Sequence, residues 1–470
     1  MTELGWASAY QVAAAIRRRE VSAAEVLTDQ LDRIQRRDAR LRSVVTLDAD
    51  GAQRRAAEAD RALARGQVWG PLHGVGVTVE DVHATAGMRS AFGGYRPFAE
   101  HVPAADATVV ARLKAAGATI VGKSNGPCLW GEDSVFPPTL NPWNADRTAG
   151  GSSTGPAVAV AAGLTPFDIA GDTSGSIQCP AAFCGVFGMR PTEHRVPVTG
   201  MLYINPVRQL RALVTAGPVA RSVGDLRLAL EVIGGPDGHD PEVPPVPWHP
   251  AGPADLNGLR VAYSPGFPSL VDAEIRAGAD RLAAELDELG AVVEDRLPDP
   301  ALARYGQLVE EFLAVLDSGS VQEYLAILDR RDRFIASWDR FFAGCDVFLA
   351  PAMPGARLAY GRRARRREPA DAGLSRPRAI SGQRLPDGGH PGRYRRQRGS
   401  VRPPADGPAL GRRAAPSHRR GDRRGHRRIP ATAGLLTEHL VPARRPARTR
   451  VPRWRAPGRR AGRRRTAESR

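Results

Sequence analysis

The composition of the chain changes abruptly near residue 356, and this change limits which part of the chain can fold. Residues 357–470 hold 34 Arg, no Lys and 7 acidic residues, a net charge of +27, whereas the residues before them carry a net charge of −10. Runs such as GRRARRREP leave few aliphatic side chains with which to build a core. We therefore predict a folded domain over residues 1–355 and an Arg-, Pro- and Gly-rich tail over residues 356–470.

Two interpretations of this tail stay open. As a disordered segment, its clustered arginines would neutralise phosphates and release counterions, which gives non-specific binding to nucleic acid. As the product of a shifted reading frame in a GC-rich gene, it would contain Arg, Pro, Gly and Ala in excess and almost no Lys, which is the composition observed. We favour the shifted frame because it accounts for the missing lysines.

The first 20 residues, MTELGWASAYQVAAAIRRRE, place charges where the apolar core of a signal peptide would lie. The longest uncharged stretch, residues 148–167, is too rich in Gly, Ser and Pro for a membrane span. No C-x-x-C pair occurs among the cysteines, which are Cys128, Cys179, Cys184 and Cys345. We expect a cytoplasmic protein with free thiols and without a metal site.

Local signals predict an alternation of helices and strands. Two helices are expected at the N-terminus, the second of which begins with a capping box formed by Ser22 and Glu25. Alternating valines over residues 75–79 predict a strand that ends at Glu80. The later elements that we predict are helices over residues 105–116, 157–162, 222–234 and 275–289 and strands over residues 118–121, 167–170, 185–189, 259–263 and 347–350. This order is typical of an α/β fold.

Residues 149–192 combine two loops of small residues with an apolar helix and a strand between them. Their sequence is AGGSSTGPAVAVAAGLTPFDIAGDTSGSIQCPAAFCGVFGMRPT. Small residues let backbones approach closely, and a Gly-containing loop can aim several N–H donors at one point. This segment is therefore the strongest candidate for a catalytic site.

The segment resembles the amidase signature family of serine hydrolases, whose hallmark is a GGSSGG loop followed by G-T-D-x-G-G-S-I-R-x-P-A and F-C-G-x-x-G-x-K-P-T. Similar pieces occur in family order elsewhere, namely PLHG before Glu80, GKSN at 122–125, NPWNADRTAGGSS at 141–153 and AGPVARSVGDL at 216–226. The resemblance covers roughly residues 5–355. It implies an α/β amidase-signature fold, a mixed sheet flanked by helices, which is incomplete at its C-terminal end because the tail cannot supply the later strands.

The resemblance assigns roles to particular residues. Ser176 matches the nucleophile that becomes acylated, and Ser152 matches the bridging serine that follows a cis peptide bond and relays the proton. The residues whose backbone N–H groups would form the oxyanion hole are Thr173, Ser174, Gly175 and Ser176. Ser153 would support Ser152 by hydrogen bonding, and Asp172 would fix the loop.

Position 80 departs from the family pattern. The family has a lysine in V-K-D, whereas this chain reads V-E-D and has Glu80 in the lysine's place. In the family, the neutral lysine takes the serine proton through the bridging serine and returns it to the leaving amine. A glutamate with an ordinary pKa of about 4.3 is a feeble base, and it lacks the lysine's reach. Gln178 and Gly76 also differ from the family's Arg and Pro, so we expect activity to be strongly reduced or absent.

The resemblance implies hydrolysis of a small-molecule amide to an acid and an amine or ammonia, with no metal or organic cofactor and no membrane. Two alternatives stay open. One is a non-catalytic amidase-like binding protein or pseudogene product. The other is a relative of the ammonia-releasing component of the transfer-RNA-dependent amidotransferase, which passes ammonia to a charged transfer RNA and would require partner proteins. The motifs specify neither the amide nor the oligomeric state.

A different motif overlaps the first loop. Residues 151–155, GSSTG, match the G-x-S-x-G nucleophile elbow of α/β-hydrolases, which would make Ser153 the nucleophile. An elbow follows a buried strand, whereas the preceding NPWNADRTAG is polar and rich in turn residues, so this interpretation is the weaker one. We expect His73, His83 and Lys123 to be structural and not to replace the missing base.

Overall fold

A computed structural model of the protein describes residues 4–126, 134–201, 212–247, 255–266, 271–353 and 355. These residues lie in the first of two units of the chain, Met1–Gln383, whereas the second unit, Arg384–Arg470, lies outside the described residues. The predicted tail over residues 356–470 and Cys128 also lie outside the described residues. The domain boundary near residue 355 therefore stays a prediction.

Two helices open the fold, as the sequence predicts. They are α1 (Ala9–Arg17) and α2 (Ala23–Leu41). The Ser22 hydroxyl accepts a hydrogen bond from the Glu25 N–H, and the Glu25 carboxylate accepts one from the Ser22 N–H, which completes the predicted capping box. Because the two groups satisfy each other's free backbone donors, α2 begins at a defined residue.

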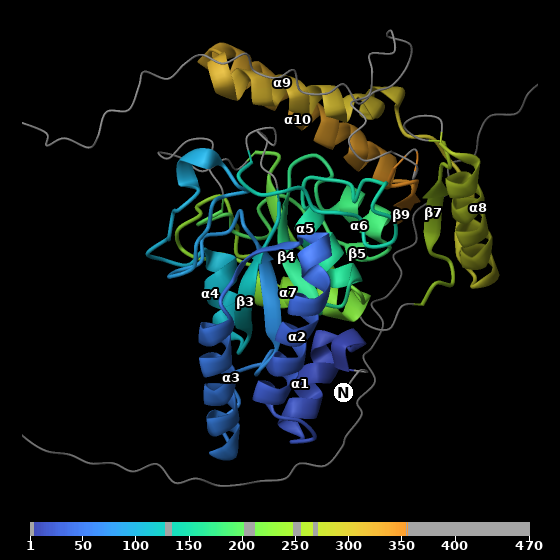
Figure 1. Cartoon of the computed structure of the whole chain (residues 1–470). Helices are drawn as coiled ribbons and strands as arrows, with labels where there is room; N and C mark the ends of the chain where they lie inside the picture. Colours follow the sequence, from blue (N-terminus) through green and yellow to red (C-terminus); the bar gives the residue numbers. More distant parts are fainter. Residues whose placement is uncertain are drawn as a thin grey trace, which may run out of the picture. The chain divides into compact units, whose positions relative to one another are not determined.

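The centre of the fold is a mixed sheet of six strands in the order β1-β3-β2-β4-β6-β5 (Figure 1). The strands are β1 (Val44–Leu47), β2 (Gly76–Glu80), β3 (Thr119–Ser124), β4 (Phe167–Asp172), β5 (Phe187–Gly188) and β6 (Thr215–Ala220). β2 runs parallel to β3 and β4, whereas β1 is antiparallel to β3, and β6 is antiparallel to β4 and β5. Every residue of β2 and β4 is buried, so the ends of these strands can position groups away from water.

Helices flank this sheet, which confirms the predicted α/β architecture. The helices after α2 are α3 (Ala49–Ala64), α4 (Thr108–Ala115), α5 (Thr154–Ala161), α6 (Gln178–Cys184), α7 (Val223–Ile233), α8 (Ala273–Glu288), α9 (Tyr305–Ser318) and α10 (Val321–Phe342), with short 3-10 helices η1 (Leu4–Trp6), η2 (Arg96–Phe98) and η4 (Pro300–Arg304). α3 and α4 pack on β3, whereas α5 packs on β2, β4 and β6. All eight residues of α5 are buried, which fits its small apolar side chains. None of the described helices combines the length and apolar character needed to cross a membrane.

A smaller parallel sheet has the strand order β8-β7-β9, with β7 (Arg260–Tyr263), β8 (Val292–Asp295) and β9 (Val347–Leu349). The sequence predicts a buried strand at residues 347–350, but Val347 is 42% exposed, and among the described residues β9 is an edge strand with one neighbour. The predicted apolar face of α8 is also only partly covered, since Leu282 and Leu289 are 44% and 63% exposed. The predicted burial is therefore wrong for β9, although both predicted elements form.

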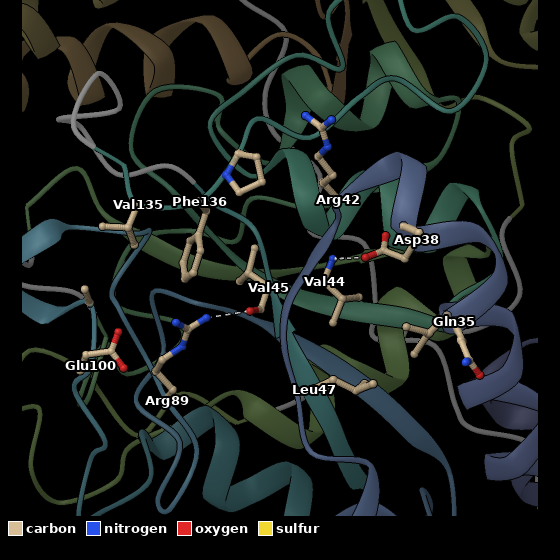
Figure 2. A pocket seen from close by; sticks show the side chains of 14 residues that line it. Gln35, Asp38, Arg42, Val44, Val45, Leu47, Arg89, Glu100, Val135 and Phe136 are labelled. Atoms are coloured by element: carbon tan, nitrogen blue, oxygen red, sulfur yellow. Dashed lines mark hydrogen bonds between the residues drawn. The ribbon is translucent and has the colours of Figure 1, made fainter.

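The outer edge of β1 borders a groove of about 670 Å³ (Figure 2). Two side chains form hydrogen bonds with the backbone of this strand. Arg89 Nη2 donates to the Val45 carbonyl oxygen at 2.9 Å, and the Val44 N–H donates to Asp38 Oδ2 at 2.9 Å. Free backbone groups on an edge strand are templates for pairing with another chain. Arg89 and Asp38 therefore reduce the capacity of β1 to pair further.

Candidate active site

Two serines from different loops meet beyond the end of β4. Ser152 lies just before α5 and follows a cis peptide bond from Gly151, and Ser176 lies between β4 and α6. The Ser152 hydroxyl donates to the Ser176 hydroxyl, with 3.1 Å between the two Oγ atoms. A backbone hydrogen bond of 3.2 Å from the Ser153 N–H to the Ser176 carbonyl oxygen also joins the two loops. The structure thus brings the two predicted serines into contact.

Asp172, the last residue of β4, holds the loop that carries Ser176. Its buried carboxylate accepts hydrogen bonds of 2.8 Å from the Gly175 N–H and the Ile177 N–H. Arg190 Nε donates to the same carboxylate at 3.2 Å. Gly175 has a φ of 100°, a conformation that an L side chain rarely adopts. The loop therefore curls around Asp172 with Ser176 between the two backbone donors.

Four backbone N–H groups are predicted to form the oxyanion hole, and the structure leaves three of them available. The Gly175 N–H donates to Asp172 and so shapes the loop. The N–H groups of Thr173, Ser174 and Ser176 have no acceptor among the described residues. Free donors beside a nucleophile are what stabilisation of an oxyanion requires. The geometry therefore leaves these three N–H groups available to a ligand, whereas the Gly175 N–H is occupied.

The Ser153 hydroxyl does not bond to Ser152, in contrast to the prediction. It is fully buried and donates to the Gly171 carbonyl oxygen at 3.0 Å. This hydroxyl therefore joins the loop to Gly171, near the end of β4, and not to Ser152. The same geometry disfavours a nucleophile elbow, because no strand precedes Ser153 within the described stretch 134–152 and the hydroxyl faces the core.

Glu80 ends β2, as predicted, and its side chain is 1% exposed. Its Oε2 accepts a hydrogen bond of 2.6 Å from the Gly171 N–H. Burial raises the pKa of Glu80 to about 8, although the Gly171 N–H and the nearby Ser153 hydroxyl lower it in part. No hydrogen bond joins Glu80 to Ser152 within the described part of the chain. At neutral pH this carboxyl is mostly protonated and is not engaged with the serine pair.

A second buried acid shares the sheet face of Glu80. Thr78 on β2 is in register with Asp168 on β4, so Asp168 and Glu80 lie on the same face of the sheet. The Asp168 carboxylate accepts a hydrogen bond of 2.5 Å from the Thr78 hydroxyl. Burial raises the pKa of Asp168 to about 7. Asp168 was not among the residues predicted from the sequence, although an acidic residue inside an apolar run is itself a signal of a special environment.

Lys123 is fully buried, but it belongs to the opposite face of the sheet. Its in-register neighbour on β2 is Val79, whereas the neighbour of Glu80 is Ser124. Its ammonium group donates to the His83 carbonyl oxygen, and burial lowers its pKa to about 8. This amine therefore does not occupy the place that the family lysine would take.

The remaining candidate side chains lie in environments that suppress their chemistry. His73 and His83 are fully buried, and burial lowers the pKa of both, that of His83 to about 3. Burial raises the pKa of the Cys179 thiol and raises that of Cys184 to about 12. Low-reactivity thiols and neutral imidazoles are typical of structural positions. Among the described cysteines, Cys179, Cys184 and Cys345 are free.

Comparison with known proteins identifies the family of this chain. The sequence model of the Amidase family matches residues 25–309. The chain belongs to the amidase family. This amidase-family chain is 39% identical over 306 residues to a component of the Glutamyl-tRNA(Gln) amidotransferase of Moorella thermoacetica, a match that covers 62% of this chain and 61% of that protein. It is 33% identical over 396 residues to an Acylamidase of Rhodococcus erythropolis, covering 76% of this chain and 81% of that protein.

Solved structures agree with this assignment. The fold is similar to that of a bacterial aryl acylamidase of the amidase signature family, with a TM-score of 0.66, 25% identity and coverage of 79% of this chain and 84% of that one. It is also similar in fold to a fatty acid amide hydrolase, with a TM-score of 0.68 and 23% identity, over 76% of this chain and 69% of that one. These findings confirm the predicted family and the predicted mixed-sheet fold of the amidase-family chain.

Proposed function

We propose that the protein is a serine amidase whose turnover is strongly reduced by Glu80. The observation that carries this proposal is the 3.1 Å hydrogen bond between the hydroxyls of Ser152 and Ser176. Two hydroxyls at this distance can pass a proton between them, which a serine nucleophile needs when it attacks an amide. The free N–H groups beside Ser176 supply the second requirement, a place for the developing negative charge.

In the proposed reaction, Ser176 Oγ attacks the amide carbonyl carbon, and the N–H groups of Thr173, Ser174 and Ser176 stabilise the oxyanion. Each such donor contributes about 3 kcal/mol to the stability of the transition state. The serine proton passes through Ser152 to the leaving nitrogen, the C–N bond breaks, and the acyl group stays on Ser176. Water then attacks the acyl carbon, its proton returns through Ser152, and the acid leaves.

Glu80 weakens this sequence at the proton-transfer steps. With a pKa of about 8, the carboxyl is mostly protonated at neutral pH and cannot accept another proton. Its Oε2 is directed to the Gly171 N–H, and the hydrogen bonds of the described residues do not connect it with Ser152. The free oxyanion donors remain, so a low residual rate is expected without a competent base.

The substitution Glu80→Lys tests the proposal. We expect it to raise the hydrolysis rate of an activated anilide by about 10²- to 10⁴-fold, the usual contribution of a positioned acid–base group. It should also accelerate the labelling of Ser176 by a fluorophosphonate, measured by mass spectrometry of the peptide that contains Ser176. Ser176→Ala should abolish both signals in the Glu80→Lys chain.

A matched control is Glu285→Lys, which makes the same amino-acid substitution at an exposed position on α8. It should leave hydrolysis and labelling at wild-type levels. Equal, brisk labelling of Ser176 in the wild-type and Glu80→Lys chains would contradict the proposed impairment. Activity that survives Ser176→Ala would contradict the assignment of the nucleophile.

One alternative has a specific observation in its favour, namely the similarity to a component of an amidotransferase. In that case glutamine would be the amide substrate, and partner proteins would be needed to use the ammonia. The Glu80→Lys chain distinguishes the two functions, because an amidase should hydrolyse anilides faster than glutamine and an amidotransferase component should not. Tight binding of an amide with no turnover in either chain would instead indicate a binding protein.

A further inference from the structure

The first turn of α9 contacts the loop that carries Ser176. Tyr305, the first residue of α9, donates a hydrogen bond of 3.2 Å from its hydroxyl to the Thr173 carbonyl oxygen. Thr173 directly follows β4, and its carbonyl belongs to the same peptide unit as the Ser174 N–H. A peptide unit is planar and trans, so holding its oxygen fixes the direction of its N–H. Tyr305 therefore orients one of the three free donors beside Ser176.

A chain of charged groups connects the same loop to α10. Arg190 donates to Asp172 at 3.2 Å and lies 3.5 Å from Glu193. Glu193 in turn accepts a hydrogen bond of 2.8 Å from Arg331 on α10. All four side chains are largely buried, which reduces screening by water. Arg331 thus acts on Asp172 through two intervening side chains.

The two helices that provide Tyr305 and Arg331 form one packed unit. α9 and α10 lie side by side (Figure 1), and the ring centroids of Tyr305 and Phe334 are 6.0 Å apart. A cluster of buried apolar residues joins the two helices to the residue Leu213, which lies shortly before β6. Its members are Leu213, Leu308, Val309, Phe312 and Ile327. The Arg190 guanidinium also donates to the Leu213 carbonyl oxygen at 3.1 Å. This pair of helices, the α9–α10 hairpin, can therefore hold the Tyr305–Thr173 and Arg331–Glu193 contacts in fixed positions.

We propose that Tyr305 and Arg331 are positioning residues of the amidase reaction, through which the α9–α10 hairpin sets the direction of the Ser174 N–H and the shape of residues 172–177. This inference rests on the proposed function, because it assumes that Ser176 is the nucleophile. Neither residue touches the reacting atoms. Their effect should appear in the transition state, where the oxyanion forms, and not in the binding of the neutral reagent.

The test uses the full chain and a fluorophosphonate, with kinact and KI measured separately. In this reaction the Ser176 Oγ–P bond forms, the P–F bond breaks, and the serine proton leaves with fluoride. We expect Tyr305→Phe to lower kinact by about 3- to 10-fold, the value of one hydrogen bond, with KI unchanged. Tyr324→Phe is the matched control, because Tyr324 lies in the same hairpin and packs near Phe312. It should retain wild-type kinact.

A second pair of variants tests the charged chain. Arg331→Gln should lower kinact in the same way, whereas Arg330→Gln should not, because Arg330 pairs with Glu311 inside the hairpin. If Tyr305→Phe failed to fold, as shown by the loss of its thermal unfolding transition, the comparison of Arg331→Gln with Arg330→Gln would test the positioning role by itself. Equal kinact in each variant and its control would overturn the positioning role and leave the proposed function intact. Failure of Ser176 to react in every chain, Glu80→Lys included, would overturn the proposed function and this inference together.

Discussion

Glu80 adds an acidic group to a part of the core that already contains two buried acids. Three buried carboxyl groups, those of Glu80, Asp81 and Asp168, lie near one buried amine, that of Lys123. With a lysine at position 80, this region would contain two buried carboxyl groups and two buried amines. Burial is the main cause of the raised pKa of each acid, and for Glu80 the repulsion by Asp168 and Asp81 adds to it. The raised pKa values favour the neutral form of these buried acids, most of all that of Glu80, whose pKa is about 8.

This arrangement predicts a pH dependence of stability. Folded Glu80 keeps its proton up to a pKa of about 8, whereas the unfolded chain releases it near 4.5, so the free energy of unfolding falls as the pH rises between these values. His83 has a folded pKa of about 3 and opposes this trend only up to pH 6.5. Between pH 6.5 and 8 we therefore expect Glu80 to lower the free energy of unfolding by about 1–2 kcal/mol. Urea unfolding of the wild type and of Glu80→Gln should show this difference in slope.

The control for this prediction is Glu285→Gln, which removes an exposed carboxyl from α8. Its unfolding free energy should follow the wild-type pH profile. Parallel profiles for the wild type and Glu80→Gln between pH 6.5 and 8 would show that Glu80 is ionised in the folded protein.

At the scale of elements, β1 depends on one carboxylate. Asp38 is buried on α2 and accepts hydrogen bonds from the Ser43 N–H and hydroxyl and from the Val44 N–H. The substitution Asp38→Ala removes the acceptor of all three hydrogen bonds and leaves their buried donors unsatisfied. We expect a loss of about 3 kcal/mol in the free energy of unfolding, measured by urea titration. Asp32→Ala, at an exposed position of the same helix, should change it by less than about 0.5 kcal/mol.

Elements with strong local signals were predictable from sequence, and those that depend on distant neighbours were not. α7 begins after Ser222 and ends before Gly234, as predicted, because capping acts over a few residues. β6 gave no strand signal, since Pro218 lies within it and cannot donate to a ladder. The predicted burial of β9 was wrong because a short apolar run indicates a strand, but not whether another element covers it.

The same distinction between local signals and distant contacts applies to the residues of the site. Ser152 and Ser176 stand 24 positions apart, and their contact could be expected only from the family resemblance. The engagement of the Gly175 N–H with Asp172 required the folded loop, because the same glycine-rich sequence allows the N–H to point either way. Tyr305 carries no local signal at all, since it reaches Thr173 across 132 positions of the chain.

At the scale of the whole molecule, the two differently charged stretches should behave differently toward polyanions. Residues 357–470 carry a net charge of +27, and the rest of the chain carries −10. We expect the full chain to bind RNA with an affinity that falls about 10³-fold or more between 50 and 200 mM salt, as measured by fluorescence anisotropy. A chain that ends at residue 356 should not bind. Binding that survives this truncation would assign the contact to the folded domain.

The origin of the tail is decided by the coding DNA near codon 356. If the reading frame has shifted, another register should encode a continuation rich in aliphatic residues, as a family member needs to complete its sheet. The restored chain should then unfold at a higher temperature than the present one, because the edge at β9 would gain a partner. A tail that is in frame would leave no such continuation in any register.

The alternation of side chains along β2 and β3 has a consequence for the history of this gene. Because Lys123 faces away from Glu80, an amine introduced one residue to either side of position 80 would emerge on the wrong side of the sheet. Only codon 80 can restore the family's lysine, and in the genetic code glutamate and lysine codons differ by one base. A single base change at codon 80 would thus be enough to place an amine on the face of the sheet that Glu80 occupies.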